Sequence, residues 1–191
     1  MLFTNNKKTS TFTFLSLLIL SGLQYSFTIE DWFQFRSIEG RFRVMTKGGF
    51  ERKVATFETD IGEVQSCVYA YTPKDQQNSE NLVYMISYND YPEGTIHSDS
   101  TAVLEDFYKA TIEESVSSVN GVKIYENDVK LQGFVGKQWR ISYANNKATI
   151  KTRAFLVKNR YYAIQTVSLS EKSANTATQR FLDSFQLLGQ D

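Results

Sequence analysis

Apolar and polar residues alternate along much of the chain, and the alternation stops at residues that favour turns. Residues 63–72 are typical, with two sets of positions facing opposite ways: Val64, Ser66, Val68 and Ala70 on one side, and Gln65, Cys67, Tyr69 and Tyr71 on the other. A period of two indicates a β-strand. Turns are expected where glycine or asparagine residues are adjacent, because both tolerate the left-handed backbone conformation. The pattern predicts eight strands: 40–45, 50–59, 63–72, 82–89, 122–127, 134–143, 147–157 and 161–168.

Two segments have the period of an amphipathic helix instead. In residues 98–118 an apolar side contains Leu104, Phe107, Tyr108 and Ile112, and the opposite side carries Glu105, Asp106, Glu113 and Glu114. A final helix is expected from Ser170 or Ser173 to the glycine at 189, with a stripe made of Ala174, Ala177, Phe181, Phe185 and Leu188. The predicted order is therefore ββββ-α-ββββ-α. Tight turns between consecutive strands predict an α+β fold with a mostly antiparallel sheet, whose faces the helices cover.

The first 26 residues have the three parts of a secretory signal peptide. Lys7 and Lys8 precede a short apolar run at 11–20, and small or polar residues follow at 21–26. The apolar run is shorter than the roughly 20 residues that a membrane-spanning helix needs. We expect cleavage between Leu23 and Thr28, export to the periplasm or the exterior, and one domain over 30–189 without a membrane span. The alternative is an uncleaved N-terminal anchor. No cysteine lies near the cut, so the segment does not fit a lipoprotein signal.

The composition excludes several classes of function. The 191 residues carry no net charge, which argues against a nucleic-acid partner. Cys67 and His97 are each the only residue of their type, so an intramolecular disulfide is impossible and a zinc cluster or Cys-His pair is not expected. We expect Cys67 to be buried, and we expect no cofactor, no metal and no catalytic activity. Two alternatives stay open: an enzyme that uses carboxylate, tyrosine or lysine chemistry, and a structural subunit with an aromatic patch at Trp32 and Phe33.

Charge is unevenly distributed along the chain. Residues 121–160 contain nine basic and two acidic residues, whereas residues 75–118 contain nine acidic residues and one lysine. A turn at Asn145 and Asn146 would place Arg140 opposite Lys151, with Arg153 on the same face of the sheet. Adjacent cations on neighbouring strands repel each other. Either acids compensate them, from Glu126 and Asp128 or from the acidic helix, or Arg140, Lys151 and Arg153 bind an anionic glycan, lipid headgroup or acidic protein.

Three stretches of the chain resemble PsbP-like α/β/α sandwich domains, a group of small exported bacterial proteins. The first is an aromatic segment followed by Ser37, Glu39, Gly40, Phe42 and Val44. The second runs from Arg153 through Arg160 to Tyr162, and the third is the Phe181, Ser184 and Phe185 motif near the C-terminus. The resemblance implies a central antiparallel sheet with helices on both faces. It implies little about activity beyond an accessory or assembly role. From the charge distribution we expect an unknown protein or an anionic ligand of the cell envelope as the partner.

Overall fold

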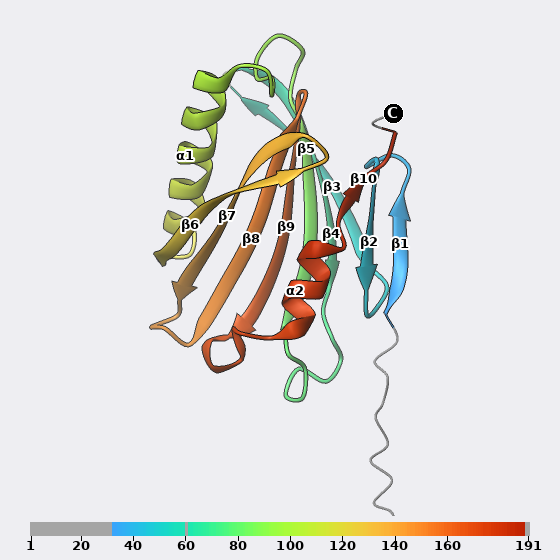
Figure 1. Ribbon diagram of the computed structural model, residues 1–191, viewed down its shortest axis with the longest axis vertical. Helices are drawn as coiled ribbons and strands as arrows, with labels where there is room; N and C mark the ends of the chain where they lie inside the picture. The colour runs from blue at the N-terminus through green and yellow to red at the C-terminus, as the bar shows by residue number, and fades with distance from the viewer. Residues whose placement is uncertain (1–31, 60, 190–191) are drawn as a thin grey trace, which may run out of the picture.

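Ten strands form two antiparallel sheets in this computed structural model, which describes residues 32–59 and 61–189 (Figure 1). The large sheet has seven strands in the order β3-β4-β5-β9-β8-β7-β6: Glu51–Thr59, Gly62–Tyr71, Val83–Asp90, Arg160–Leu169, Ala148–Val157, Phe134–Tyr143 and Val122–Leu131. The small sheet has the order β1-β2-β10: Phe33–Ser37, Phe42–Thr46 and Gln186–Leu187. The predicted signal peptide, 1–26, lies outside the described residues.

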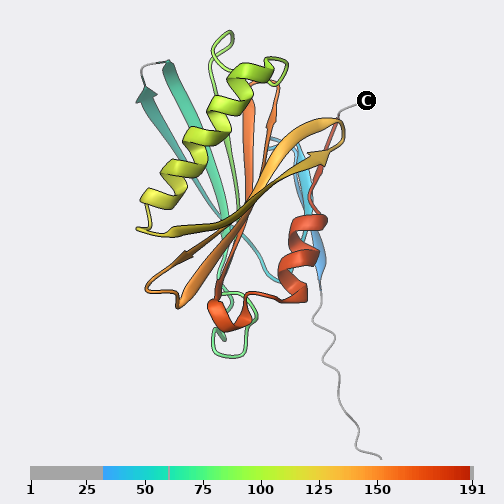
Figure 2. The same ribbon diagram turned by 60° about the vertical axis from the view of Figure 1, so that its left-hand side comes forward.

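One helix lies on each side of the large sheet. Helix α1 (Thr101–Ser117) runs diagonally across one face, and helix α2 (Thr176–Asp183) lies on the other face beside the small sheet (Figures 1 and 2). The predicted antiparallel sheet with helices on its faces is confirmed. Neither helix in the described parts of the chain has both the length and the apolar character needed to cross a membrane.

Strands β8 and β9 bury side chains on both of their faces. Phe155 and Tyr162 belong to the core under α2, while their sequence neighbours Leu156 and Tyr161 belong to the core under α1. All four side chains are at most 6% exposed. Each fully buried side chain of this size contributes roughly 1.5–3 kcal/mol, so the large sheet is stabilised from both sides.

Helix α1 packs through the apolar side that its sequence predicts. Tyr108 and Ile112 are each 2% exposed, and Leu104 and Phe107 pack against the same core. Glu105, Asp106, Glu113 and Glu114 are exposed, as expected.

The Tyr108 hydroxyl group lies between strands β7 and β8 where their pairing ends. The last backbone pair joins Gly136 to Phe155. Beyond it, the hydroxyl accepts a hydrogen bond from the Leu156 amide at 2.8 Å and donates one to the Val135 carbonyl at 3.2 Å. Burial raises the pKa of Tyr108 to about 12. Val135 is 42% exposed, and the Tyr108 hydroxyl bonds to both Val135 and Leu156 where a direct backbone bond would otherwise join the strands.

The C-terminal segment differs from its prediction. The expected helix from 170 or 173 to 188 is a 3₁₀ turn (Ser170–Lys172), the eight-residue helix α2 and the short strand β10. The Asn175 side chain caps α2 by accepting a hydrogen bond from the Thr178 amide at 2.6 Å. The Ser184 hydroxyl donates to the Phe181 carbonyl at the other end of the helix. Phe185 and Leu187 then enter the core from extended backbone.

The prediction also missed one strand and ended another too early, so the predicted ββββ-α-ββββ-α order is incomplete. Residues 33–37 form strand β1, which pairs with β2 after the turn before Arg41. Strand β6 continues past 127 to Leu131, where Gln132 and Gly133 turn the chain with positive φ angles of 46° and 91°.

Replacing Tyr108 with phenylalanine tests the hydroxyl between the strands. Tyr108→Phe leaves the Leu156 amide and the Val135 carbonyl without that partner, so we expect the free energy of unfolding to fall by about 1–3 kcal/mol. Urea denaturation measures the change. Tyr143→Phe is the control, because the Tyr143 hydroxyl makes no hydrogen bond with the described residues. Equal stability of the two variants would contradict the bridging role.

Candidate functional site

The β7–β8 hairpin has the register that its turn residues predict. Arg140 pairs with Lys151, and Gln138 pairs with Arg153. Ala144, Asn145 and Asn146 turn the chain with φ angles between 52° and 63°. Directly paired residues share a face, so Arg140, Lys151 and Arg153 lie together on the face that α2 partly covers. We call these three residues the cationic row.

Polar side chains surround the cationic row on the neighbouring strands. Tyr125 on β6 pairs with Arg140, and Thr166 on β9 pairs with Lys151. One step toward the hairpin turn there are three buried hydroxyl groups: Ser142, Thr149 and Ser168. Burial raises the pKa of Tyr125, and the charges of Arg140 and Arg153 oppose that rise. This part of the sheet face is therefore polar, unlike the aromatic core under α2.

Arg153 is fixed by contacts with the end of α2. Its Nη1 lies 2.8 Å from an oxygen of the Asp183 carboxylate and donates to the Leu182 carbonyl at 3.2 Å. Its Nε and Nη2 donate to Gln138 Oε1 at 3.1 and 3.0 Å. The side chain is 17% exposed. Asp183 neutralises its charge, and Gln138 and the Leu182 carbonyl accept its other hydrogen bonds.

The acids that the sequence offered as compensation lie on the opposite face. Glu126 pairs across the strands with Trp139, and Asp128 pairs with Lys137. Trp139 belongs to the core under α1. There Lys137 Nζ lies 3.4 Å from Glu126 and 2.6 Å from Asp128. The exposed acids of α1 also lie on that side of the sheet, so neither group neutralises the cationic row.

Arg140 and Lys151 have no ion-pair partner among the described residues. Arg140 Nε is buried and has no hydrogen-bond partner there either. The pKa of Lys151 is lowered, chiefly by burial and then by the charges of Arg153 and Arg140, while Asp183 opposes the shift. Two adjacent cations are thus held on neighbouring strands without an ion-pair partner among the described residues.

The sequence interpretation missed Asp183. A carboxylate at the C-terminal end of a helix meets the negative end of the helix dipole, which is unfavourable unless a cation is close. The presence of Asp183 near the C-terminal end of the helix could therefore have indicated a nearby basic residue. Only the three-dimensional structure identifies Arg153, 30 residues away.

The other candidate residues lie apart from the cationic row. Cys67 is buried in the core under α2 at 1% exposure, as expected. His97 Nδ1 accepts a hydrogen bond from the Asp99 amide in the loop before α1. Within residues 32–59 and 61–189, no group of three or more His, Cys, Asp and Glu residues could hold a metal ion.

The N-terminal aromatic residues do not form a joint exposed patch. Trp32 packs against Tyr84 and lies under the cationic groups of Lys47 and Arg180, 5.3 and 4.9 Å from its ring centre. Phe33 is 46% exposed. These positions give the structural-subunit alternative little support.

Removing the charge of Lys151 should stabilise the fold. Because its folded-state pKa is lowered, the unfolded state binds the proton more tightly, and wild-type stability rises as the pH approaches the ordinary lysine value of 10.5. We expect Lys151→Met to raise the free energy of unfolding at pH 7 by about 0.5 kcal/mol, and this gain should shrink toward pH 10. Denaturation at both pH values measures it, with Lys130→Met on β6 as the control. A loss of stability at pH 7 would show that the ammonium group is well compensated.

Comparisons with known proteins agree with this architecture. No protein-family model and no curated protein matches the chain. The fold is similar to the solution structure of cyanobacterial PsbP (CyanoP) from Synechocystis sp. PCC 6803, with a TM-score of 0.51 and 10% sequence identity. The similarity covers 85% of this chain and 95% of that one. At this identity it concerns the fold and not the activity. The resemblance inferred from the sequence is confirmed at this level: the chain has a PsbP-like fold.

Proposed function

We propose that this chain is an exported, non-enzymatic domain that binds an anionic partner at the cell envelope through Arg140 and Lys151. The observation that carries the proposal is the pair of adjacent cations without an ion-pair partner in the described structure. An anion that meets both side chains would offset their repulsion and satisfy the buried Nε of Arg140.

The spacing of the two cations suits a compact acidic group. Directly paired residues of an antiparallel sheet have their Cβ atoms about 4.5–5.5 Å apart. A carboxylate or sulfate group can therefore accept hydrogen bonds from both side chains at once, and such charge-assisted bonds are the stronger kind. Because Arg140 and Lys151 project from paired strands, the backbone that carries them is already ordered before a ligand binds.

Arg153 has a different role from the one its sequence position suggested. Asp183 and Gln138 already hold its guanidinium group. We assign it to positioning: it ties the end of α2 to β8. Arg140 and Lys151 are the residues that meet the ligand.

The binding proposal is tested with two anionic probes, heparin and poly-glutamate. Arg140→Gln combined with Lys151→Gln should weaken binding about tenfold, equivalent to about 1.4 kcal/mol. Biolayer interferometry at 50 and 150 mM NaCl measures the affinity, and the wild-type affinity should fall as salt screens the charges.

A charge-matched control separates a local site from a general effect of net charge. Lys109→Gln combined with Lys130→Gln removes two exposed lysines of α1 and β6. This variant should bind both probes within about twofold of the wild type. Equal weakening of the two double variants would contradict a site at Arg140 and Lys151.

Export is tested through the fate of residues 1–26. We expect mass spectrometry of the protein from the envelope fraction to find an N-terminus created by cleavage between Leu23 and Thr28. A Leu18→Asp, Ile19→Asp variant should keep the full chain and stay inside the cell, because two charges interrupt the apolar run. A full-length wild-type chain in the membrane fraction would support the uncleaved anchor instead.

A further inference from the structure

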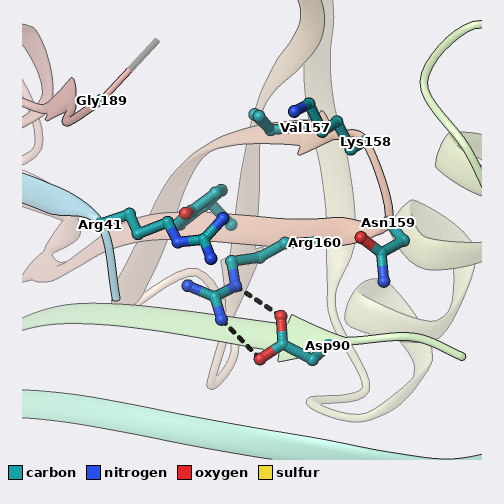
Figure 3. Close-up of a pocket in the computed structure, with 8 residues that line it drawn as sticks. Arg41, Asp90, Val157, Lys158, Asn159, Arg160 and Gly189 are labelled. Carbon is teal, nitrogen blue, oxygen red and sulfur yellow. Dashed lines mark hydrogen bonds and ion pairs between the residues drawn. The ribbon is translucent and has the colours of Figure 1, made fainter. Parts of the chain in front are cut away.

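A polar cavity of about 230 Å³ lies where four distant parts of the chain meet. Its lining comes from the turn before β2, the end of β5, the β8–β9 turn with the start of β9, and Gly189 after β10 (Figure 3). Three of the lining residues are basic and one is acidic: Arg41, Lys158, Arg160 and Asp90. The cavity is separate from the cationic row, whose residues do not line it.

Arg160 and Asp90 form the fixed part of the cavity. The guanidinium group donates to both oxygens of the Asp90 carboxylate and, through Nη1, to the Glu39 carbonyl at 2.8 Å. It also lies over the Tyr88 ring, 4.5 Å from the ring centre. A guanidinium group has five N–H donors, so these three bonds leave two donors, and the Tyr162 hydroxyl lies within hydrogen-bonding reach of the same group. Asp90 neutralises Arg160 but no other cation of the cavity.

Arg41 and Lys158 have no ion-pair partner in the described parts of the chain. Both are exposed, and their charges add to that of Arg160 around one small volume. Arg41 and Arg160 lie close enough to the Tyr162 phenol to oppose the rise in its pKa that burial causes. The described lining residues therefore carry an excess of two positive charges.

Arg41 and Lys158 both adopt a left-handed backbone conformation that is unfavourable for residues with a side chain. Arg41 has a φ angle of 53° and Lys158 one of 57°. Glycine or asparagine adopts this left-handed region at lower cost, and the chain uses them at Asn120, Asn145, Asn146, Gly94 and Gly133, whereas Gln132 and Ala144 adopt it outside the cavity. Strained backbone at a cavity indicates that the side chain serves a purpose besides stability.

Hydrogen bonds hold both turns in place. The Ser98 hydroxyl accepts from the Lys158 amide at 3.1 Å, and the Asn159 side chain donates to the Tyr91 carbonyl at 2.7 Å. The Arg41 carbonyl accepts from the Leu188 amide at 2.8 Å. The backbones that carry the two cations are thus fixed before any ligand arrives, which lowers the entropic cost of binding.

We propose that this cavity is a binding site for a compact oxyanion of the phosphate type, held by Arg41 and Lys158 with the remaining donors of Arg160. Arginine presents paired N–H donors to phosphate oxygens, and lysine supplies a point charge. The site is independent of the anionic partner proposed for Arg140 and Lys151. The shared chemistry is the phosphate group, either free or carried by a larger molecule.

The test titrates the full mature domain with sodium phosphate and, separately, with glycerol phosphate, at an ionic strength held constant with chloride. We expect saturable NMR shifts of the amides at 41, 42, 158 and 160. Saturation with either ligand supports the site, and a tighter fit of glycerol phosphate identifies a carried phosphate group. No saturable shift with either ligand up to tens of millimolar would overturn the proposal.

Glycine substitutions remove each side chain without straining the backbone. Arg41→Gly and Lys158→Gly should each weaken phosphate binding about tenfold while leaving thermal stability equal or higher. A purely structural role would leave binding unchanged, and that result would also overturn the proposal. Ala144→Gly relieves a similar φ angle of 52° away from the cavity, so it should raise stability without changing phosphate affinity.

The Arg140→Gln, Lys151→Gln variant distinguishes this site from the proposed function. It should bind phosphate with unchanged affinity at the amides of the cavity. Loss of phosphate binding in this variant would place the anion on the cationic row and would overturn the cavity site. Loss of heparin binding without loss of phosphate binding supports two separate sites.

Discussion

The burial of strands β8 and β9 on both faces is the constraint on which the rest of the structure depends. Leu156 and Tyr161 on one face and Phe155 and Tyr162 on the other cannot remain in water. Helix α1 covers the first face, whereas the second is covered by a short helix and a small sheet made from both ends of the described chain. The eight-residue α2 leaves part of its face to polar residues, and the cationic row lies there.

Local patterns predicted the elements whose partners are close in the sequence. Alternation together with the turn at Asn145 and Asn146 was enough to place Arg140 opposite Lys151. The 3.6-residue period was enough to identify the buried side of α1. The segment 181–188 was ambiguous because Phe181 and Phe185 are four residues apart, which suits a continuing helix. Residues 186–187 form a strand because Gln186 pairs with Arg43. The two residues are far apart in the sequence, so a local pattern cannot show this pairing.

The basic residues of the two candidate sites fall into two groups that the sequence does not separate. Arg153 and Arg160 are held by the carboxylates of Asp183 and Asp90, which are 30 and 70 residues away. Arg140, Lys151, Arg41 and Lys158 have no such partner in the described structure. The sequence was enough to locate an excess of positive charge between 121 and 160. It was not enough to tell which of these cations form ion pairs within the fold, because such pairs join segments that are distant in the sequence.

The pairing of β2 with β10 also affects the order in which parts of the fold form. Arg43 Nε donates to the Gln186 side chain at 2.8 Å across 143 residues of sequence. Contacts between such distant residues form late, since the loop-closure entropy must be overcome first. The small sheet therefore lacks its third strand until Gln186 and Leu187 are available to pair with β2. Until then the aromatic core under α2 stays open on one side, so this core closes only after Gln186 and Leu187 have paired with β2.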